Sequence, residues 1–317
     1  MSLTQQLTWL LDTTQSEKDY IESVQKSGIF ENTVASAYPQ TVTARLVREH
    51  FTDTDCGKRK KALIVGFDGA RAYGMLNLVK SRDPKLDVTN ENSPLSAVCA
   101  VKEQGGLYLT YAGGEPGDRQ TKQDTSTAPG WASVLTGVWA RDHGVYGMET
   151  MNSAYPTALL ELARRGVSAC FYGLWETHFA NTYKGEIETA QKERLPLEYL
   201  HCKSENDLHG QLLRAIDADV DCIFGVYEGP DSCGHGVSFT NNNYLYTKSI
   251  SDCDRCAYEL MERVRARDTY ENEDWLILIT SDHGGHKRRH GTQKIQDRMT
   301  FLASSKRIET LYPFRIR

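Results

Sequence analysis

The hydrophobic residues of this chain fall into short apolar runs that alternate with segments of helical spacing. The apolar runs predict strands over residues 62–67, 107–111, 169–174, 222–227, 276–280 and 300–303. Helical spacing predicts helices around residues 75–79, 127–138, 157–165, 208–216 and 250–265, and residues 96–102 fit either element. Strands that alternate with helices predict an α/β fold, with a mostly parallel central sheet covered by helices on both faces.

Two segments do not follow this alternation. Residues 1–58 have helical spacing, first at Leu3, Leu7, Leu10 and Leu11, and end in a polar cluster at 52–57. We therefore expect a helical N-terminal appendage over residues 1–58 and a main domain over 59–317. Residues 175–204 are mostly polar and predict a small cap insertion. The N-terminal appendage could cap a site or mediate formation of a homo-oligomer.

Composition narrows the class of protein. Hydrophobic residues make up 39% of the 317 residues and charged residues 25%, so the chain can bury a large core. The formal net charge of −5 gives no electrostatic reason to bind nucleic acid. We see no membrane span and no convincing signal peptide, so the eight cysteines are interpreted as reduced thiols of a cytoplasmic protein.

Three of the predicted strands end in loops that carry acidic residues or histidines. Strand 62–67 is followed by Asp68; the loops after strands 222–227 and 276–280 carry Asp231, His235, Asp282, His283, His286 and His290. The carboxyl ends of neighbouring parallel strands meet at one edge of a sheet, which is where ligands bind. Carboxylates and imidazoles together suit zinc or manganese. The sequence thus predicts enough ligands for two metal ions.

A hydroxyl group at a helix start completes this set. Thr127 begins a predicted helix, and Pro129 is compatible with its first turn. A helix N-terminus favours an anion such as phosphate, and a nearby metal pair would activate the hydroxyl group for phosphoryl transfer. Ser126 is the competing nucleophile, and a plain helix cap is the alternative role of Thr127.

These motifs resemble those of the alkaline phosphatase superfamily, most closely its type I phosphodiesterase/nucleotide pyrophosphatase branch. The similar segments are TAP at 127–129, PDSCGH at 230–235, SDHG at 281–284 and HG at 290–291, and they occur in the order of that branch. The resemblance implies an alkaline-phosphatase-like catalytic domain over residues 59–317. It also implies hydrolysis of phosphodiester or pyrophosphate bonds in a small phosphate ester or nucleotide.

The resemblance assigns a role to each site residue. It makes Thr127 the nucleophile, which forms a phospho-threonine intermediate. One metal ion would be held by Asp68, Thr127, Asp282 and His283, and the second by Asp231, His235 and His290. Apart from the resemblance, His286 in the same loop is the alternative to His290 as a ligand. The superfamily usually uses zinc at both positions, and manganese is the alternative.

The sequence departs from the branch at one position. No Asn follows His143 and Gly144 until Asn152, although the branch uses an Asn there to bind a phosphoryl oxygen. The alternatives are a phosphomonoesterase, or a phosphonate or sulfate ester hydrolase of the same superfamily. An alternative of another class is a non-catalytic, metal-dependent protein that binds a phospho-ligand. We expect His143 to be structural, and the pair Cys253 and Cys256 to belong to a helix that packs on the core.

Overall fold

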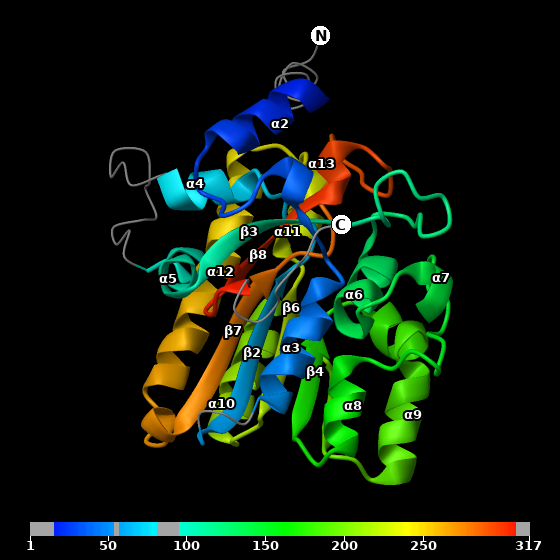
Figure 1. Cartoon of the computed structure of the whole chain (residues 1–317), viewed down its shortest axis with the longest axis vertical. Coiled ribbons are helices and arrows are strands. Elements are labelled where there is room, and N and C mark those ends of the chain that lie inside the picture. Colours follow the sequence, from blue (N-terminus) through cyan, green and yellow to red (C-terminus); the bar gives the residue numbers. More distant parts are fainter. Residues whose placement is uncertain (1–15, 54–56, 81–94, 309–317) are drawn as a thin grey trace.

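An eight-stranded sheet forms the centre of the computed structural model, which describes residues 16–53, 57–80 and 95–308 (Figure 1). The strands follow one another across the sheet in the order β1 (Tyr38–Pro39), β3 (Gly106–Tyr111), β8 (Met299–Ser304), β7 (Glu273–Thr280), β2 (Arg59–Phe67), β6 (Cys222–Tyr227), β4 (Ala169–Gly173) and β5 (Leu197–His201). Among the described strands, β8 alone runs antiparallel to its neighbours. The prediction of a mostly parallel sheet is confirmed.

The register of the three central strands brings their carboxyl ends together. Strand β2 pairs in parallel with β7 on one side and with β6 on the other. Gly66 lies opposite Thr280, and Phe67 lies opposite Tyr227. The residues that follow these strands therefore leave the sheet side by side. Strand β2 is buried from Lys61 onward, which agrees with its place in the middle of a covered sheet.

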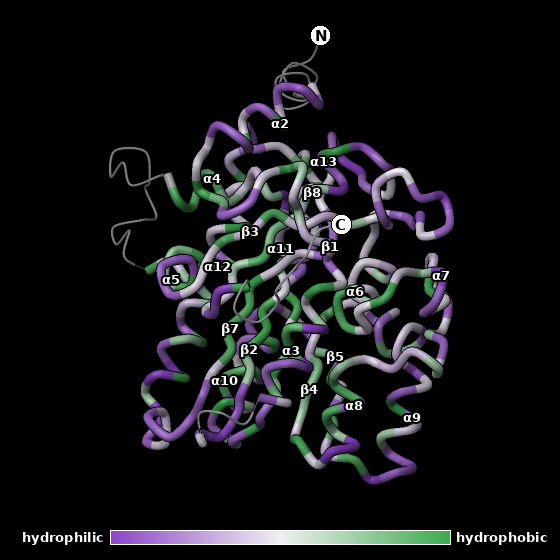
Figure 2. Tube along the Cα trace, in the orientation of Figure 1, coloured by the Kyte–Doolittle hydropathy of each residue, from purple (hydrophilic) through white to green (hydrophobic). Residues whose placement is uncertain are grey.

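Helices cover both faces of the sheet, as the alternating pattern predicts. One core layer receives side chains from α2 (Glu17–Lys26), α4 (Gly74–Lys80), α5 (Ala97–Gln104), α10 (Glu205–Asp217) and α12 (Tyr244–Arg265). The other receives them from α3 (Val42–Thr52), α6 (Thr127–Thr136) and α8 (Ala158–Arg164). Figure 2 shows hydrophobic residues along β2 and β7 and hydrophilic residues on the outer helices. Helix α12 starts earlier than predicted because Asn243 caps it by accepting a hydrogen bond from the Leu245 N–H.

Residues 34–52, expected to form part of a separate helical appendage, pack into the α/β domain. The short strand β1 extends the sheet beside β3, and α3 packs on α6 and α8. Leu46 and Val47 of α3 are buried in the second core layer. The predicted helix around Leu3–Leu11 lies outside the described residues.

The segment expected to be a cap insertion, residues 175–204, also contributes to the sheet. It contains a π-helical turn (His178–Thr182), helix α9 (Lys184–Glu193) and strand β5, which pairs in parallel with β4 at the sheet edge. Most of this segment is therefore part of the α/β body, and only Trp175 lines the cavity described below. The strand was missed because an edge strand with exposed Glu198 and His201 has no continuous apolar run.

Membrane-spanning helices and cysteine pairing, both considered from the composition, can be examined in the structure. Within residues 16–53, 57–80 and 95–308, no helix combines the length and apolar character that crossing a membrane requires. No disulfide joins the seven cysteines in this part of the chain. Cys253 is buried in the core on α12, as expected, and Cys256 lies on the same helix at the edge of that core.

Candidate metal centre

The structure brings the predicted ligand residues together at the carboxyl edge of the sheet. Asp68 follows β2 directly, and Asp282 and His283 follow β7. Asp231 and His235 lie on α11 (Gly229–Gly236), the short helix after β6. Since β7, β2 and β6 are neighbours, their loops converge, as the sequence predicted for parallel strands.

One group consists of Asp68, Asp282 and His283, and all three side chains are almost completely buried. The Nε2 atom of His283 lies 3.5 Å from Asp68 Oδ1 and 3.3 Å from Asp282 Oδ2. Thr127 Oγ1 lies 3.5 Å from the same nitrogen. This is the ligand set that the resemblance assigned to one metal ion.

A second group surrounds Asp231 and is partly exposed. Suitable ligand atoms of Asp231, His283 and His290 lie within 4.8 Å of one another. His235 Nε2 adjoins them, at 3.5 Å from Asp231 Oδ2 and 3.0 Å from His290 Nε2. The rings of His283 and His290 stack with their centroids 4.0 Å apart. His283 thus joins the two groups, which the sequence did not predict.

The histidine tautomers favour a cation between these side chains. The Nδ1–H groups of His235, His283 and His290 donate to the carbonyl oxygens of Arg288 (3.1 Å), Gly284 (2.7 Å) and Thr125 (3.1 Å). Each neutral ring then presents an Nε2 lone pair to the centre, as metal-ligating histidines do. The facing lone pairs of His235 and His290 repel each other unless they share a cation.

The carboxylates point to the same conclusion. Asp68 Oδ1, Asp231 Oδ1 and Asp282 Oδ2 are buried and accept no hydrogen bond. Burial, with repulsion from Asp282, Asp231 and Glu228, raises the pKa of Asp68 well above its usual range. Burial also raises the pKa of Asp282 and lowers that of His283. Divalent cations would offset the free-energy cost of burying these carboxylates in their charged form. The residues present therefore fit a centre for two such ions.

Helix α6 brings Thr127 to these groups. The helix begins at Thr127, and Ser126 is its N-cap residue. Gly130 allows a close approach: a Cβ atom added there would lie 2.9 Å from Asp282 Cβ. Trp131 Nε1 of the same helix donates a hydrogen bond of 2.9 Å to Asp68 Oδ2. This contact had no signal in the sequence.

A cavity of about 310 Å³ opens beside Thr127. Its lining contains five of the predicted site residues: Asp68, Thr127, Asp231, His235 and His290. Gly147 and Met148 lie in its wall, in the region where the branch would place an Asn. Trp175 and Glu228 also line it, and sequence reasoning did not single out Glu228 as a site residue.

His286 and His143 form their contacts with residues that belong to neither ligand group. His286 Nδ1 lies 2.6 Å from Asp297 Oδ1, and neither ligand group includes His286. Its expected role as a substitute for His290 is therefore not supported by the geometry. His143 Nε2 lies 3.0 Å from Ser133 Oγ, and its Nδ1 accepts from the Val145 N–H. These contacts are the loop-bracing role expected of a structural histidine.

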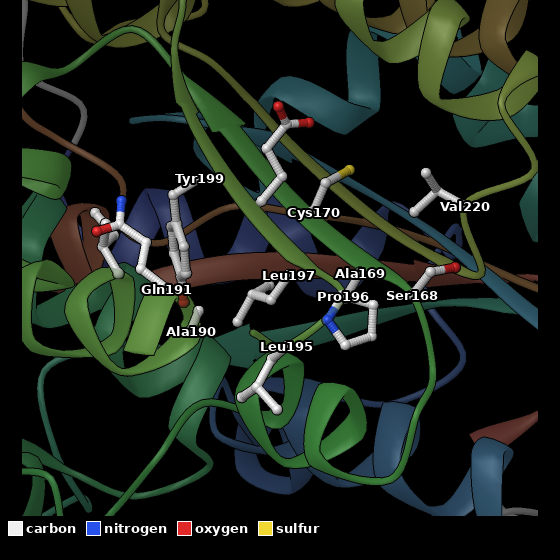
Figure 3. Close-up of a pocket in the computed structure, with 12 residues that line it drawn as sticks. Ser168, Ala169, Cys170, Ala190, Gln191, Leu195, Pro196, Leu197, Tyr199 and Val220 are labelled. Atoms are coloured by element: carbon white, nitrogen blue, oxygen red, sulfur yellow. The ribbon is translucent and has the colours of Figure 1, made fainter. Parts of the chain in front are cut away.

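A second cavity, of about 450 Å³, lies beside the first residues of β4 and β5 (Figure 3). Figure 3 shows mainly apolar side chains around it, including Leu195, Pro196 and Leu197. None of the predicted site residues lines this cavity. We therefore place the candidate site at the carboxyl edge of the sheet.

Comparison with known proteins identifies the fold. No family model matches the chain, and no curated protein is similar to it in sequence. Among solved structures, a phosphonate monoester hydrolase of Agrobacterium radiobacter superposes with a TM-score of 0.50 at 13% identity, covering 78% of this chain and 68% of that one. The 2-O GAG sulfatase BT1596 gives a TM-score of 0.50 at 9% identity, with 78% and 64% covered.

Murine ectonucleotide pyrophosphatase/phosphodiesterase 5, solved in complex with AMP, gives a TM-score of 0.45 at 18% identity. That match covers 71% of this chain but only 57% of the murine protein. At these identities the likeness shows the fold alone, and the alkaline-phosphatase-like α/β fold that the motifs implied is confirmed by the two superpositions with a TM-score of 0.50.

Proposed function

We propose that this chain hydrolyses phosphodiester or pyrophosphate bonds of a small phosphate ester or nucleotide, through a phospho-threonine intermediate at Thr127. The observation that carries the proposal is the position of Thr127 Oγ1, which lies 3.5 Å from His283 Nε2 in a cavity that Asp68 and Asp231 also line. A hydroxyl group at the start of a helix, beside unpaired carboxylates and imidazoles, suits phosphoryl transfer.

We assign the ligands as the resemblance implies, with zinc or manganese as the ions. Asp68, Asp282, His283 and Thr127 would hold one cation, and Asp231, His235 and His290 the other. Bound there, the cations would lower the pKa of the Thr127 hydroxyl group and offset the negative charge of the phosphate. Support comes from the buried carboxylate oxygens and the Nε2 lone pairs that face this space.

The chain's own groups would orient and attack the phosphate. Pro129 has no N–H group and the Gly130 N–H donates to Ser126, so the amides of Thr127 and Ala128 are the first-turn donors at the cavity. Thr127 Oγ1 would attack phosphorus while the bond to the leaving alcohol or phosphate breaks. Water would then attack the same phosphorus, break its bond to Oγ1 and restore the hydroxyl group.

A nucleophile variant tests this proposal. Thr127→Ala should lose turnover of bis-p-nitrophenyl phosphate while it still binds metal, and Thr127→Ser should keep part of the activity. A non-catalytic receptor of a phospho-ligand would instead bind its ligand equally well with any of the three residues. Unchanged turnover in Thr127→Ala would contradict the nucleophile assignment.

A second candidate is a phosphonate or sulfate ester hydrolase. It is favoured by the cavity wall, where Gly147 and Met148 provide no side-chain amide for a phosphoryl oxygen. Rates with bis-p-nitrophenyl phosphate, p-nitrophenyl phosphate, p-nitrophenyl sulfate, p-nitrophenyl phenylphosphonate and nucleotides would separate these activities. We expect the diester or nucleotide to be the fastest substrate of the metal-loaded protein.

A further inference from the structure

Phe239 is a completely buried residue that touches two of the ligand loops. Its ring lies directly against the backbone of Gly234 on α11 and of Gly285 behind His283. A Cβ atom added to either glycine would lie 2.4 Å from a ring carbon, so neither position has room for a side chain. The ring therefore acts as a spacer between the loop that carries His235 and the loop that carries His290.

The same ring also contacts both histidines. It meets His235 with ring centroids 5.4 Å apart at 83°, and His290 at 6.0 Å and 85°. These edge-to-face contacts constrain the orientation of each imidazole. Because the Nε2 atoms of the two histidines are 3.0 Å apart, the orientation of the rings decides where a shared cation would be held.

The backbone of Phe239 is fixed from two sides. Its N–H donates to the carbonyl oxygen of Lys287, in the His290 loop, at 2.5 Å. Its carbonyl oxygen accepts from Arg71 Nη1, also at 2.5 Å. Arg71 belongs to the loop that begins with Asp68. Phe239 thus connects all three loops that carry the proposed ligands.

Arg71, which donates this hydrogen bond to Phe239, is a buried cationic side chain. Arg71 is 3% exposed, and within the described part of the chain its Nε and Nη2 atoms have no hydrogen-bond partner. Its guanidinium group lies 4.7 Å from the ring centre of Tyr20, which comes from helix α2. Burying a cation without a carboxylate partner is costly. Arg71 is nevertheless buried beneath Tyr20 of helix α2, and its Nη1 group donates a hydrogen bond to the Phe239 carbonyl oxygen.

We infer that Phe239, held by Arg71, is a positioning residue that sets His235 and His290 around the cation site of Asp231. The inference rests on the proposed two-metal centre. Neither Phe239 nor Arg71 lines the catalytic cavity, so both act through the histidines and not on the substrate. Helix α2 contributes Tyr20, whose ring covers the Arg71 guanidinium group.

The test compares cation binding by the full-length, chelator-treated protein and its Phe239→Leu variant. Cobalt(II) is titrated and followed by its visible absorption, which needs no turnover. We expect two binding events in the wild-type protein, and one event weakened about 10–100-fold in Phe239→Leu, with the other unchanged. The matched control is Phe171→Leu, because Phe171 is equally buried but stands on β4, away from the ligand loops. It should keep both events while losing thermal stability.

A second variant keeps the inference testable if Phe239→Leu does not fold. Arg71→Met removes the hydrogen bond to Phe239 and keeps an apolar stem under Tyr20; it should weaken the same event by a smaller factor. The positioning role would be overturned if Phe239→Leu bound cobalt with wild-type affinity in both events, or if Phe171→Leu lost as much cobalt affinity as Phe239→Leu. Either result would leave the proposed metal centre standing. Failure of the wild-type protein to bind cobalt would overturn the proposed metal centre, and this inference with it.

Discussion

The indole N–H of Trp131 donates a 2.9 Å hydrogen bond to Oδ2 of Asp68, so the helix that starts with Thr127 is tied directly to a proposed metal ligand. The other oxygen of this carboxylate, Oδ1, accepts no hydrogen bond and faces His283 at 3.5 Å. One contact therefore fixes both the helix of the nucleophile and the direction of the free carboxylate oxygen. Hydrogen bonds to metal ligands of this kind orient them and raise metal affinity.

Replacing the indole tests this relationship. Trp131→Phe keeps an aromatic ring in the core but leaves Asp68 Oδ2 without its donor. We expect metal affinity to fall about 10–100-fold, with a parallel loss of turnover at limiting metal. Metal titration of the chelated protein and kcat at saturating metal would be measured together.

The chain offers a matched control for this variant. Trp139 Nε1 donates at 2.8 Å to Glu115 Oε1, and Trp139 is also buried. Trp139→Phe removes an indole hydrogen bond to a carboxylate that belongs to neither ligand group. It should leave metal affinity unchanged. An equal loss in both variants would mean that Trp131 acts only through packing.

Metal removal should lower the stability of the fold. Without cations, Asp68, Asp231 and Asp282 stand together with unpaired oxygens, which disfavours the folded state. A cation that binds only the folded protein adds about 2.7 kcal/mol when its concentration is 100 times its Kd. We expect chelation to lower Tm by several degrees and zinc to restore it. Equal melting curves with and without chelator would contradict a metal centre in this position.

Much of this edge of the sheet could be predicted from the sequence. The runs of β2, β6 and β7 are apolar because these strands are buried in the middle of the sheet, so short hydrophobic runs identified them. The rule that parallel strands share a carboxyl edge then placed Asp68 beside Asp282. The structure brings these two together, although the metal roles assigned to them stay predictions.

Other features could not be predicted, for physical reasons. Strand β5 is an edge strand with polar outward residues, so its sequence resembles an insertion. The reversed direction of β8 leaves no mark in a short apolar run. Phe239 is a single aromatic residue in a loop, and its importance depends on Gly234 and Gly285 having no side chains. Such contacts are set by tertiary packing and have no local pattern.

Asp282→Asn should separate metal binding from folding. Burial raises the pKa of Asp282 well above its usual range, and repulsion from Asp231 adds to this rise. An amide of the same shape carries no charge and can still accept the hydrogen bond that the Gly69 N–H donates to Oδ1. We expect the metal-free variant to have a Tm equal to or above that of the metal-free wild type. Zinc should no longer raise it, and turnover should be lost.

Two results would oppose this expectation. A large drop in the Tm of the metal-free variant would show that the Asp282 carboxylate stabilises the fold by itself. A full response to zinc would show that Asp282 is not a ligand. Differential scanning calorimetry of both proteins, with and without zinc, makes the comparison.

Asp254 should make the stability of the fold depend on pH at a position remote from the metal centre. It is buried on α12, and its Oδ1 accepts a hydrogen bond of 2.8 Å from the Val98 N–H in the first turn of α5. Burial raises the pKa of Asp254 to about 6, above its ordinary value of 3.8. The folded state therefore holds this proton more tightly than the unfolded state does.

The sign of the effect follows from this difference. The stabilising contribution of the protonated carboxyl group is complete below pH 3.8 and is lost as pH rises through about 6. The shift corresponds to about 3 kcal/mol, at 1.36 kcal/mol for each pKa unit. Asp254→Asn cannot ionise, so between pH 4 and 7 its free energy of unfolding should rise relative to the wild type by up to this amount. Urea denaturation of both proteins across this range measures the difference, and a constant difference would mean that Asp254 titrates alike in the folded and unfolded chains.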